Sequence, residues 1–166
     1  LVAYASDRLS NVTNLDLSVQ PLAAGSHPIR LTQNPADDMN PSFSPDGGQI
    51  AFFSSREGGG IYLIPGLGGT ERLLVRGGRY PRFSPDGRWI AYSSGTRGYQ
   101  SESKVFIIPV GGDTLKQVAV DIPWTSEPVW SPDGRRLLVA GAPKTNDLAS
   151  LDFWLVSPEG GASEKT

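Results

Sequence analysis

The chain has 166 residues, with 15 lysines and arginines, 17 aspartates and glutamates, and a formal net charge of -2. This length allows one domain with a substantial core, whereas the charge balance excludes the concentrated basic surface that nucleic acid requires. The apolar runs are far shorter than the roughly 20 residues of a membrane-spanning helix, so direct membrane insertion is not expected. No cysteine is present, which excludes disulfides, thiolate metal sites and a cysteine nucleophile.

The first 33 residues predict three strands. Apolar residues alternate with small or polar ones over 2–6 and 15–19, and a third short run covers 29–32. Ala24-Gly25 supplies a turn between the second and third runs. Compared with the segments that follow, this stretch matches a four-stranded unit whose first strand is missing.

The next two stretches, 34–76 and 77–120, each predict four strands. In both, a short strand ends in an aromatic residue followed by Ser-Pro-Asp-Gly, and a second strand of the form Ile-Ala-aromatic follows that turn. A third apolar run then leads to a glycine pair, Gly68-Gly69 or Gly111-Gly112, and a fourth run follows at 72–75 or 117–120. The stretch 121–166 repeats the pattern and ends at the start of a fourth strand.

The tetrapeptide Ser-Pro-Asp-Gly occurs three times, at 44–47, 84–87 and 131–134. Proline suits the start of such a turn because its φ is already near about -65°. The aspartate side chain bonds to nearby backbone, and glycine accepts the left-handed conformation that follows. Each copy is therefore predicted to be the hairpin between the first and second strands of a unit, and each glycine pair the hairpin between the third and fourth.

Four-stranded units of about 40 residues are typical of β-propeller blades, in which each small sheet packs against its neighbours. The fold class is therefore all-β: a β-propeller of four-stranded antiparallel blades. About four blades are present, at 1–33, 34–76, 77–120 and 121–166. Because the first blade lacks its innermost strand and the C-terminus does not supply one, we expect part of a larger ring or an unclosed ring. Nine repeated positions are predicted to form the core between blades: Phe43, Phe83, Trp130, Phe52, Tyr92, Val139, Tyr62, Phe106 and Trp154.

The repeat resembles that of TolB-like β-propeller proteins, whose signature is an aromatic residue, Ser-Pro-Asp-Gly and an Ile-Ala-aromatic strand. The stretches 43–52 and 83–92 carry the whole signature, and 130–134 carries its first half. Such repeats are found in the periplasmic TolB partner of the Tol–Pal system, in prolyl-oligopeptidase-type propellers, and in C-terminal sensor regions of bacterial serine/threonine kinases. The stretch 29–62 resembles the kinase group most.

The resemblance implies a non-catalytic module that binds a protein or a peptide, with the sensor or scaffold region of a bacterial signalling protein as its setting. The alternative is an accessory propeller of a prolyl-oligopeptidase-type serine peptidase whose catalytic domain lies outside this chain. The resemblance also suggests a periplasmic or extracytoplasmic location. A metal-dependent propeller lyase or lactonase is disfavoured, because such sites gather several histidines and carboxylates and His27 is the only histidine.

No catalytic, cofactor-binding or metal-ligating residue is predicted. His27 lies directly before Pro28 in a predicted turn. Ser101 and Lys104 match the Ser-x-x-Lys motif of acylating enzymes in letters only. That chemistry is carried by a pair on one helical turn, whereas this pair lies at the start of a predicted strand.

One face of the propeller is predicted to bind the partner. Loops that join fourth to first strands share this face with loops that join second to third strands, and functional residues concentrate in such loops. Trp124 is the favoured aromatic anchor because it lies outside the repeated core positions; ion pairs between blades are the alternative role for the charged residues. Self-association through open blade edges is a further expectation. The predicted partner-binding residues are Arg8, Asp37, Asp38, Arg56, Arg79, Tyr80, Arg97, Tyr99, Trp124 and Glu127.

Overall fold

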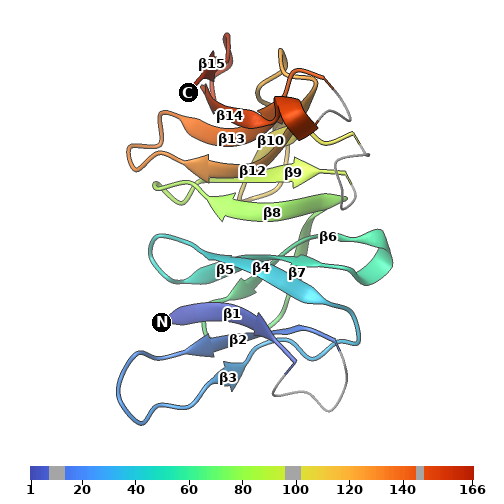
Figure 1. Ribbon diagram of the computed structural model, residues 1–166. Coiled ribbons are helices and arrows are strands. Elements are labelled where there is room, and N and C mark those ends of the chain that lie inside the picture. Colours follow the sequence, from blue (N-terminus) through green and yellow to red (C-terminus); the bar gives the residue numbers. More distant parts are fainter. Residues whose placement is uncertain (8–13, 96–101, 145–147) are drawn as a thin grey trace.

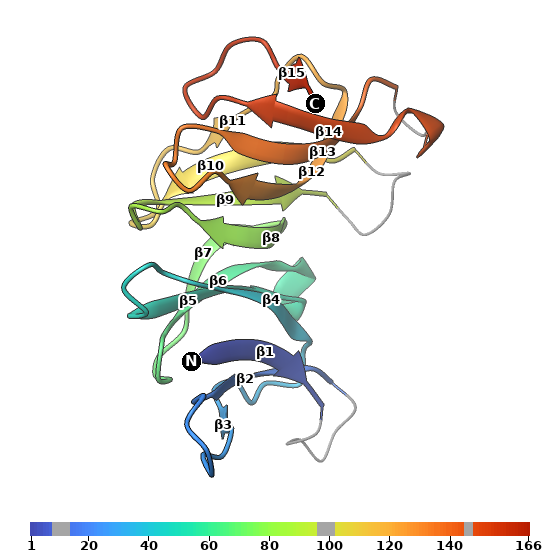
Figure 2. The same ribbon diagram turned by 60° about the vertical axis from the view of Figure 1, so that its left-hand side comes forward.

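A computed structural model describes residues 1–7, 14–95, 102–144 and 148–166. Nearly all of its regular structure is β-strand, in four antiparallel sheets. Figures 1 and 2 show the sheets following one another from the N-terminal end of the chain to the C-terminal end, each facing the next. Among the described residues, no helix has the length and hydropathy needed to cross a membrane.

The strands of each sheet lie side by side in chain order, and we name the sheets blades 1 to 4. Blade 1 holds β1 (Val2–Ser6), β2 (Asp16–Gln20) and β3 (Ile29–Arg30). Blade 2 holds β4 (Asp38–Phe43), β5 (Gln49–Ser54), β6 (Gly60–Pro65) and β7 (Arg72–Arg76). Blade 3 holds β8 (Gly78–Phe83), β9 (Trp89–Ser94), β10 (Val105–Pro109) and β11 (Lys116–Gln117). Blade 4 holds β12 (Trp124–Trp130), β13 (Leu137–Ala142), β14 (Asp152–Val156) and β15 (Glu164–Lys165). Short 3-10 turns, η1 (Arg56–Gly58) and η2 (Leu148–Ser150), follow β5 and β13.

This arrangement confirms the predicted fold class, an unclosed β-propeller with about four antiparallel blades. The first strands β4, β8 and β12 contact one another from blade to blade, while β7, β11 and β15 form the opposite ends of their sheets. Blade 1 has three strands, and β1 pairs with β2 alone. Blades 1 and 4 lie at opposite ends of the stack, so the ring stays open (Figure 1).

The three Ser-Pro-Asp-Gly turns have the predicted place and the same internal bonding. In blade 3 the hydroxyl of Ser84 donates to Asp86 at 2.6 Å and accepts from the amide of Trp89 at 3.0 Å. The amide of Gly87 donates to the carbonyl of Ser84 at 2.9 Å, and Gly87 has a φ of 72°. The same set of bonds recurs at 44–49 and 131–136, so each turn fixes the register of its first two strands.

A separate hydrophobic cluster fills each of the three junctions between blades. Phe52 lies in the first cluster, Tyr92 in the second and Val139 in the third, and all three are buried. All nine positions that the repeat assigned to the core belong to these clusters or pack against them. Burying one such side chain stabilises the fold by roughly 1.5–3 kcal/mol, so the clusters explain why the blades stack.

The two end blades differ in the chemistry of their uncovered faces. On blade 4 this face is apolar, and its Phe153 is 56% exposed. The residue of blade 3 that occupies the position equivalent to Phe153 is Val105, and it is fully buried under blade 4. On blade 1 the uncovered face is mixed, because Ser18 and Gln20 occupy the register positions of Tyr62 and Ile64 in blade 2 and pair with Tyr4 and Val2. The same face carries Leu138, Ala140, Leu155 and Val129, and its edge on β15 carries the charged Glu164.

The fourth strand of blade 3 is shorter than the sequence predicted. The third blade was expected to pair residues 117–120, but β11 covers only Lys116–Gln117. The chain then turns inward, because Val118 is 1% exposed and Ala119 has a φ of 53°. Burial of these side chains in the junction with blade 4 takes the place of further strand pairing.

Candidate functional site

Seven of the ten predicted partner-binding residues fall within the described residues. Arg8, Arg97 and Tyr99 lie outside them. The loops of the predicted face do meet as expected: the amide of Thr125, at the start of blade 4, donates to the carbonyl of Ser103, which precedes β10, at 3.0 Å. This bond brings the segment before β10 next to the start of β12, and a partner-binding role for this face remains a prediction.

The acidic residues before blade 2 are engaged within the protein. Asp38 is fully buried and pairs with the guanidinium of Arg56 at 3.2 Å, and Arg56 also pairs with Glu71. The carboxylate of Asp37 accepts from the amide of Leu15 at 2.9 Å. These contacts correct the prediction for Asp38 as a residue that meets a partner, because a fully buried carboxylate has no surface to present.

Trp124 is also placed differently from the prediction. Its side chain is 6% exposed, because β12 begins at this residue and pairs it with Ala142. It therefore belongs to the interior and not to an interface. Arg79 is half-buried, with its guanidinium 4.6 Å from the ring centroid of Phe53 in the neighbouring blade, a cation–π contact that ties blade 3 to blade 2.

We call the first strands β4, β8 and β12 the inner strands. The last two predicted residues, Tyr80 and Glu127, occupy equivalent positions on β8 and β12. Together with Asn40 they have φ values of 52°, 53° and 55°, in the positive region that non-glycine residues rarely adopt. Each precedes a proline and lies at a break in the register of the first strand with the second, a β-bulge. The three blades thus share one strained backbone geometry and vary the side chain that it carries.

These three residues line one cavity of about 270 Å³. Its walls come from the inner strands of blades 2, 3 and 4 and from the uncovered face of blade 4. Glu127 is exposed, and Phe153 and Val129 add apolar surface at 56% and 51% exposure. The cavity thus combines an acidic group, a guanidinium, a phenol and an amide with apolar surface. The other residues that line it are Arg82, Pro128 and Leu138.

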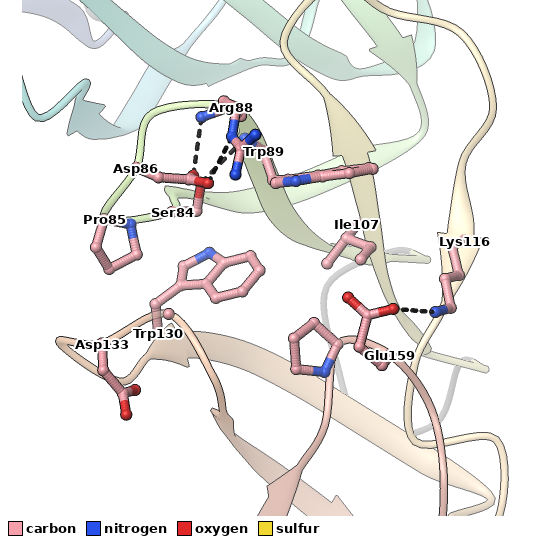
Figure 3. A pocket seen from close by; sticks show the side chains of 12 residues that line it. Ser84, Pro85, Asp86, Arg88, Trp89, Ile107, Lys116, Trp130, Asp133 and Glu159 are labelled. Atoms are coloured by element: carbon pink, nitrogen blue, oxygen red, sulfur yellow. Dashed lines mark hydrogen bonds and ion pairs between the residues drawn. The ribbon is translucent and has the colours of Figure 1, made fainter.

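A larger cavity, of about 470 Å³, lies on the opposite face of the propeller, between the turns of blades 3 and 4. Figure 3 shows Trp130 at its centre, with Trp89 and Arg88 on the side of blade 3 and Glu159 on the side of blade 4. We call it the tryptophan cleft. It is also lined by Ser84, Pro85, Asp86, Ile107, Lys116, Asp133, Gly134 and Pro158.

Hydrogen bonds and ion pairs fix the walls of the tryptophan cleft. The indole N–H of Trp130 donates to the carbonyl of Arg82 at 3.1 Å. Arg88 Nε donates to Asp86 at 2.8 Å, and Lys116 Nζ lies 3.9 Å from the carboxylate of Glu159 across the junction. The bond from Ser84 is the main cause that lowers the pKa of Asp86 to about 2, so this carboxylate is anionic at neutral pH.

The junction between blades 2 and 3 has a smaller cavity of about 310 Å³ at the same place in the repeat. There Gln49 and Phe83 take the positions of Trp89 and Trp130. The tryptophan cleft was not found from the sequence, because Trp130 was assigned to the core and Trp89 was not singled out. A comparison of the second residue after each Ser-Pro-Asp-Gly would have shown that only one repeat places an indole there.

Nothing in the described residues forms a group of three or more histidines, cysteines or carboxylates placed to hold a metal ion. His27 is exposed. Ser101 of the Ser-x-x-Lys sequence lies outside the described residues, and Lys104 donates to the carbonyls of Ile122 and Pro123 at 3.1 and 2.6 Å.

Solved structures with the same fold include TolB proteins and a peptidase. The chain matches a putative TolB from Agrobacterium tumefaciens with a TM-score of 0.80 and 23% identity, over 98% of this chain and 59% of that one. It matches TolB from Acinetobacter baumannii with a TM-score of 0.79 and 19% identity, over 98% and 39%. It matches an acylaminoacyl peptidase from Pyrococcus horikoshii with a TM-score of 0.62 and 16% identity, over 98% and 30%.

The chain thus has a TolB-like β-propeller fold, as the repeat predicted. It spans less than two thirds of the length of each of these three proteins. No protein-family model and no curated protein sequence matches it. At these identities the likeness establishes the fold, and function has to be argued from the surface of this chain.

Proposed function

We propose that the chain is a non-catalytic propeller module that binds a protein segment or a peptide on its inner strands. One observation carries the proposal: Asn40, Tyr80 and Glu127 share a strained backbone conformation, differ in side chain, and line one cavity. A constant scaffold with variable side chains is typical of recognition surfaces. Strained non-glycine residues persist where the surroundings fix them, often at sites that hold a ligand.

The chemistry of this cavity favours a peptide with one apolar side chain and a hydrogen-bonding or basic group next to it. Val129 offers apolar contact, and Tyr80 combines an apolar ring with a hydroxyl, the type of side chain that dominates interface hot spots. Glu127 would pair with a cation on the ligand. We place this module first in the sensor or scaffold region of a bacterial signalling protein, a setting supported by the resemblance of residues 29–62 to kinase sensor repeats.

Peptides selected from a display library on the immobilised chain test the proposal. The library is selected on the Trp89→Gln variant, which lacks one indole of the tryptophan cleft. Peptides that bind in that cleft are therefore not enriched. Tyr80→Ala and Glu127→Gln are each expected to weaken binding of a selected peptide at least about tenfold. The control is Tyr4→Ala, which removes a half-buried tyrosine from blade 1. Selected peptides that bind all four variants equally would refute the inner-strand site.

An accessory propeller of a serine peptidase is the second candidate, favoured by the likeness to the acylaminoacyl peptidase. A fluorophosphonate probe for serine hydrolases, applied to the natural polypeptide that carries this chain, separates the two. Labelling of that polypeptide would support the peptidase setting. Peptide binding through Tyr80 and Glu127 without labelling would support the signalling module.

We also infer that two copies of the chain associate through the uncovered face of blade 4. This face is apolar, and the equivalent faces of blades 1 to 3 are each covered by the next blade. The uncovered face of blade 1 is mixed in character, because Val2 and Tyr4 pair there with Gln20 and Ser18. Pairing of blade 4 with blade 4 about a twofold axis therefore fits better, because the same patch then meets itself.

A further inference from the structure

We propose that the tryptophan cleft is a second binding site, for an extended proline-containing peptide segment that carries a basic residue. The site lies between the turns of blades 3 and 4 and shares no lining residue with the inner-strand cavity. The proposal therefore stands or falls independently of the function proposed above.

The two indoles offer flat apolar surface and one hydrogen-bond donor. The indole N–H of Trp130 donates to the carbonyl of Arg82 at 3.1 Å. A ligand can therefore contact the face of the Trp130 ring but not its N–H group. Trp89 is half-buried, and within the described residues its indole N–H makes no hydrogen bond. Proline lacks a backbone N–H, so a proline-rich segment offers carbonyl acceptors in excess, which matches a donor such as Trp89.

An extended proline-rich segment also suits the shape of the site. Such segments form a polyproline II helix before they bind, and they dock in grooves lined by aromatic rings with little loss of conformational entropy. Pro85 of blade 3 and Pro158 of blade 4 both line the cleft, and Ile107 adds apolar surface. The lining therefore offers rigid apolar surface along the opening between the two blades.

The charges around the cleft favour a cation on the ligand. Three carboxylates, those of Asp86, Asp133 and Glu159, face two cations. Arg88 is bonded to Asp86. Lys116 approaches Glu159 only to 3.9 Å, and the side chains of Lys116 and Glu159 are both exposed. A lysine or arginine of the ligand would meet the negative charge of Glu159, because Asp133 already has the charge of Arg135 beside it. Salt would screen this attraction.

The repeat provides the argument that the indoles serve recognition. The junction between blades 2 and 3 has the same Ser-Pro-Asp-Gly turns and packs with Gln49 and Phe83 in the equivalent positions. The fold of a junction therefore does not require two tryptophans. Replacing them by the residues of the neighbouring junction gives matched variants, Trp89→Gln and Trp130→Phe, that keep the pattern of the repeat.

The test uses the whole chain and three defined peptides, followed by tryptophan fluorescence and by calorimetry. The first peptide has six prolines followed by two arginines, the second has six prolines followed by two glutamates, and the third replaces the prolines by alternating glycine and serine. We expect saturable binding of the first peptide, weakened at least about tenfold by Trp89→Gln. Trp130→Phe is also expected to weaken binding of the first peptide. This variant tests the site if Trp89→Gln does not fold.

The charge argument has its own control. Glu159→Gln is expected to weaken the arginine-bearing peptide by a few-fold and to reduce the effect of added salt. Glu57→Gln removes a similarly exposed carboxylate on blade 2 and is expected to change nothing. The proposal is overturned if the glycine-serine peptide binds as tightly as the proline peptide. It is overturned equally if both tryptophan variants bind like the wild type, or if the cleft binds an N-acetylglucosamine tetrasaccharide and no peptide.

Discussion

Arg56 reaches back from the turn after β5 to the fully buried carboxylate of Asp38 at the start of β4, at 3.2 Å. The same guanidinium lies 4.3 Å from the ring centroid of Tyr62 and pairs with Glu71. The side-chain amide of Asn34 donates to the carboxylate of Asp38 at 2.8 Å. Residues that the sequence suggested for a partner thus hold the first, second, third and fourth strands of blade 2 together.

The first prediction follows from that ion pair. Asp38→Ala leaves the cation of Arg56 with one partner fewer in a largely buried site, so we expect the free energy of unfolding to fall by about 2–4 kcal/mol. Glu57→Ala breaks the exposed pair with Arg76, for which we expect less than about 0.5 kcal/mol. Urea denaturation measures both. Equal losses in the two variants would contradict the structural role of the Asp38 pair.

The Ser-Pro-Asp-Gly turns predict how stability changes in acid. The hydrogen bond from Ser84 is the main cause that lowers the pKa of Asp86 to about 2, below its ordinary 3.8. A carboxyl whose pKa is lower in the folded state stabilises the fold above its ordinary pKa, and this contribution is lost as the pH falls from about 4 to about 2. Ser84→Ala is expected to raise the pKa of Asp86 toward 3.8 and to weaken this acid dependence. NMR titration of the carboxyl carbons measures it, with Ser131→Ala as the variant that should leave Asp86 unchanged.

The positive φ of Glu127 predicts an unusual response to glycine. Glycine adopts this conformation without strain, whereas an L-residue there pays about 1–2 kcal/mol. We expect Glu127→Gly to leave the free energy of unfolding unchanged or to raise it by up to about 1 kcal/mol, while abolishing the acidic contact in the inner-strand cavity. Val129→Gly, on the same strand and 51% exposed, is expected to lower it by about 1 kcal/mol. Thermal or urea unfolding measures both variants. A larger loss in the free energy of unfolding for Glu127→Gly than for Val129→Gly would contradict the strain argument.

The apolar face of blade 4 predicts concentration-dependent association. Sedimentation velocity of the wild-type chain is expected to show dimers that increase with concentration. Phe153→Asp places a charge in the centre of the face and is expected to give monomers. Leu67→Asp changes a residue that is 72% exposed in a hairpin of blade 2 and is expected to leave the dimer intact. Dimers that survive Phe153→Asp, or a wild type that stays monomeric, would exclude this interface.

The strands, turns and junction cores were predictable from the sequence because the repeat encodes them locally. Ser-Pro-Asp-Gly determines its hairpin through bonds within six residues, as between Ser84 and Trp89. The buried position of Trp124 was missed because it depends on where β12 begins. Aligning the prolines at 41, 81 and 128 would have placed Trp124 on that strand, three residues before the bulge at Glu127.

The cavities were harder to predict because they depend on contacts between blades. Tyr80 was chosen from the sequence as a loop residue, but the structure places it on an inner strand next to Asn40, which was not chosen. Positive φ at three equivalent positions is a property of the bulges, and no local sequence pattern other than the following proline marks it. Likewise, Trp89 and Trp130 are far apart in sequence and meet only when blade 4 packs on blade 3.

NMR mapping of a library-selected peptide on the wild-type chain tests the central claim most directly. The account predicts that the largest amide shifts fall at Asn40, Tyr80 and Glu127, on the inner strands of three blades. A selected peptide that shifts only the outer strands β7, β11 and β15, or that leaves these three amides unchanged, would contradict it.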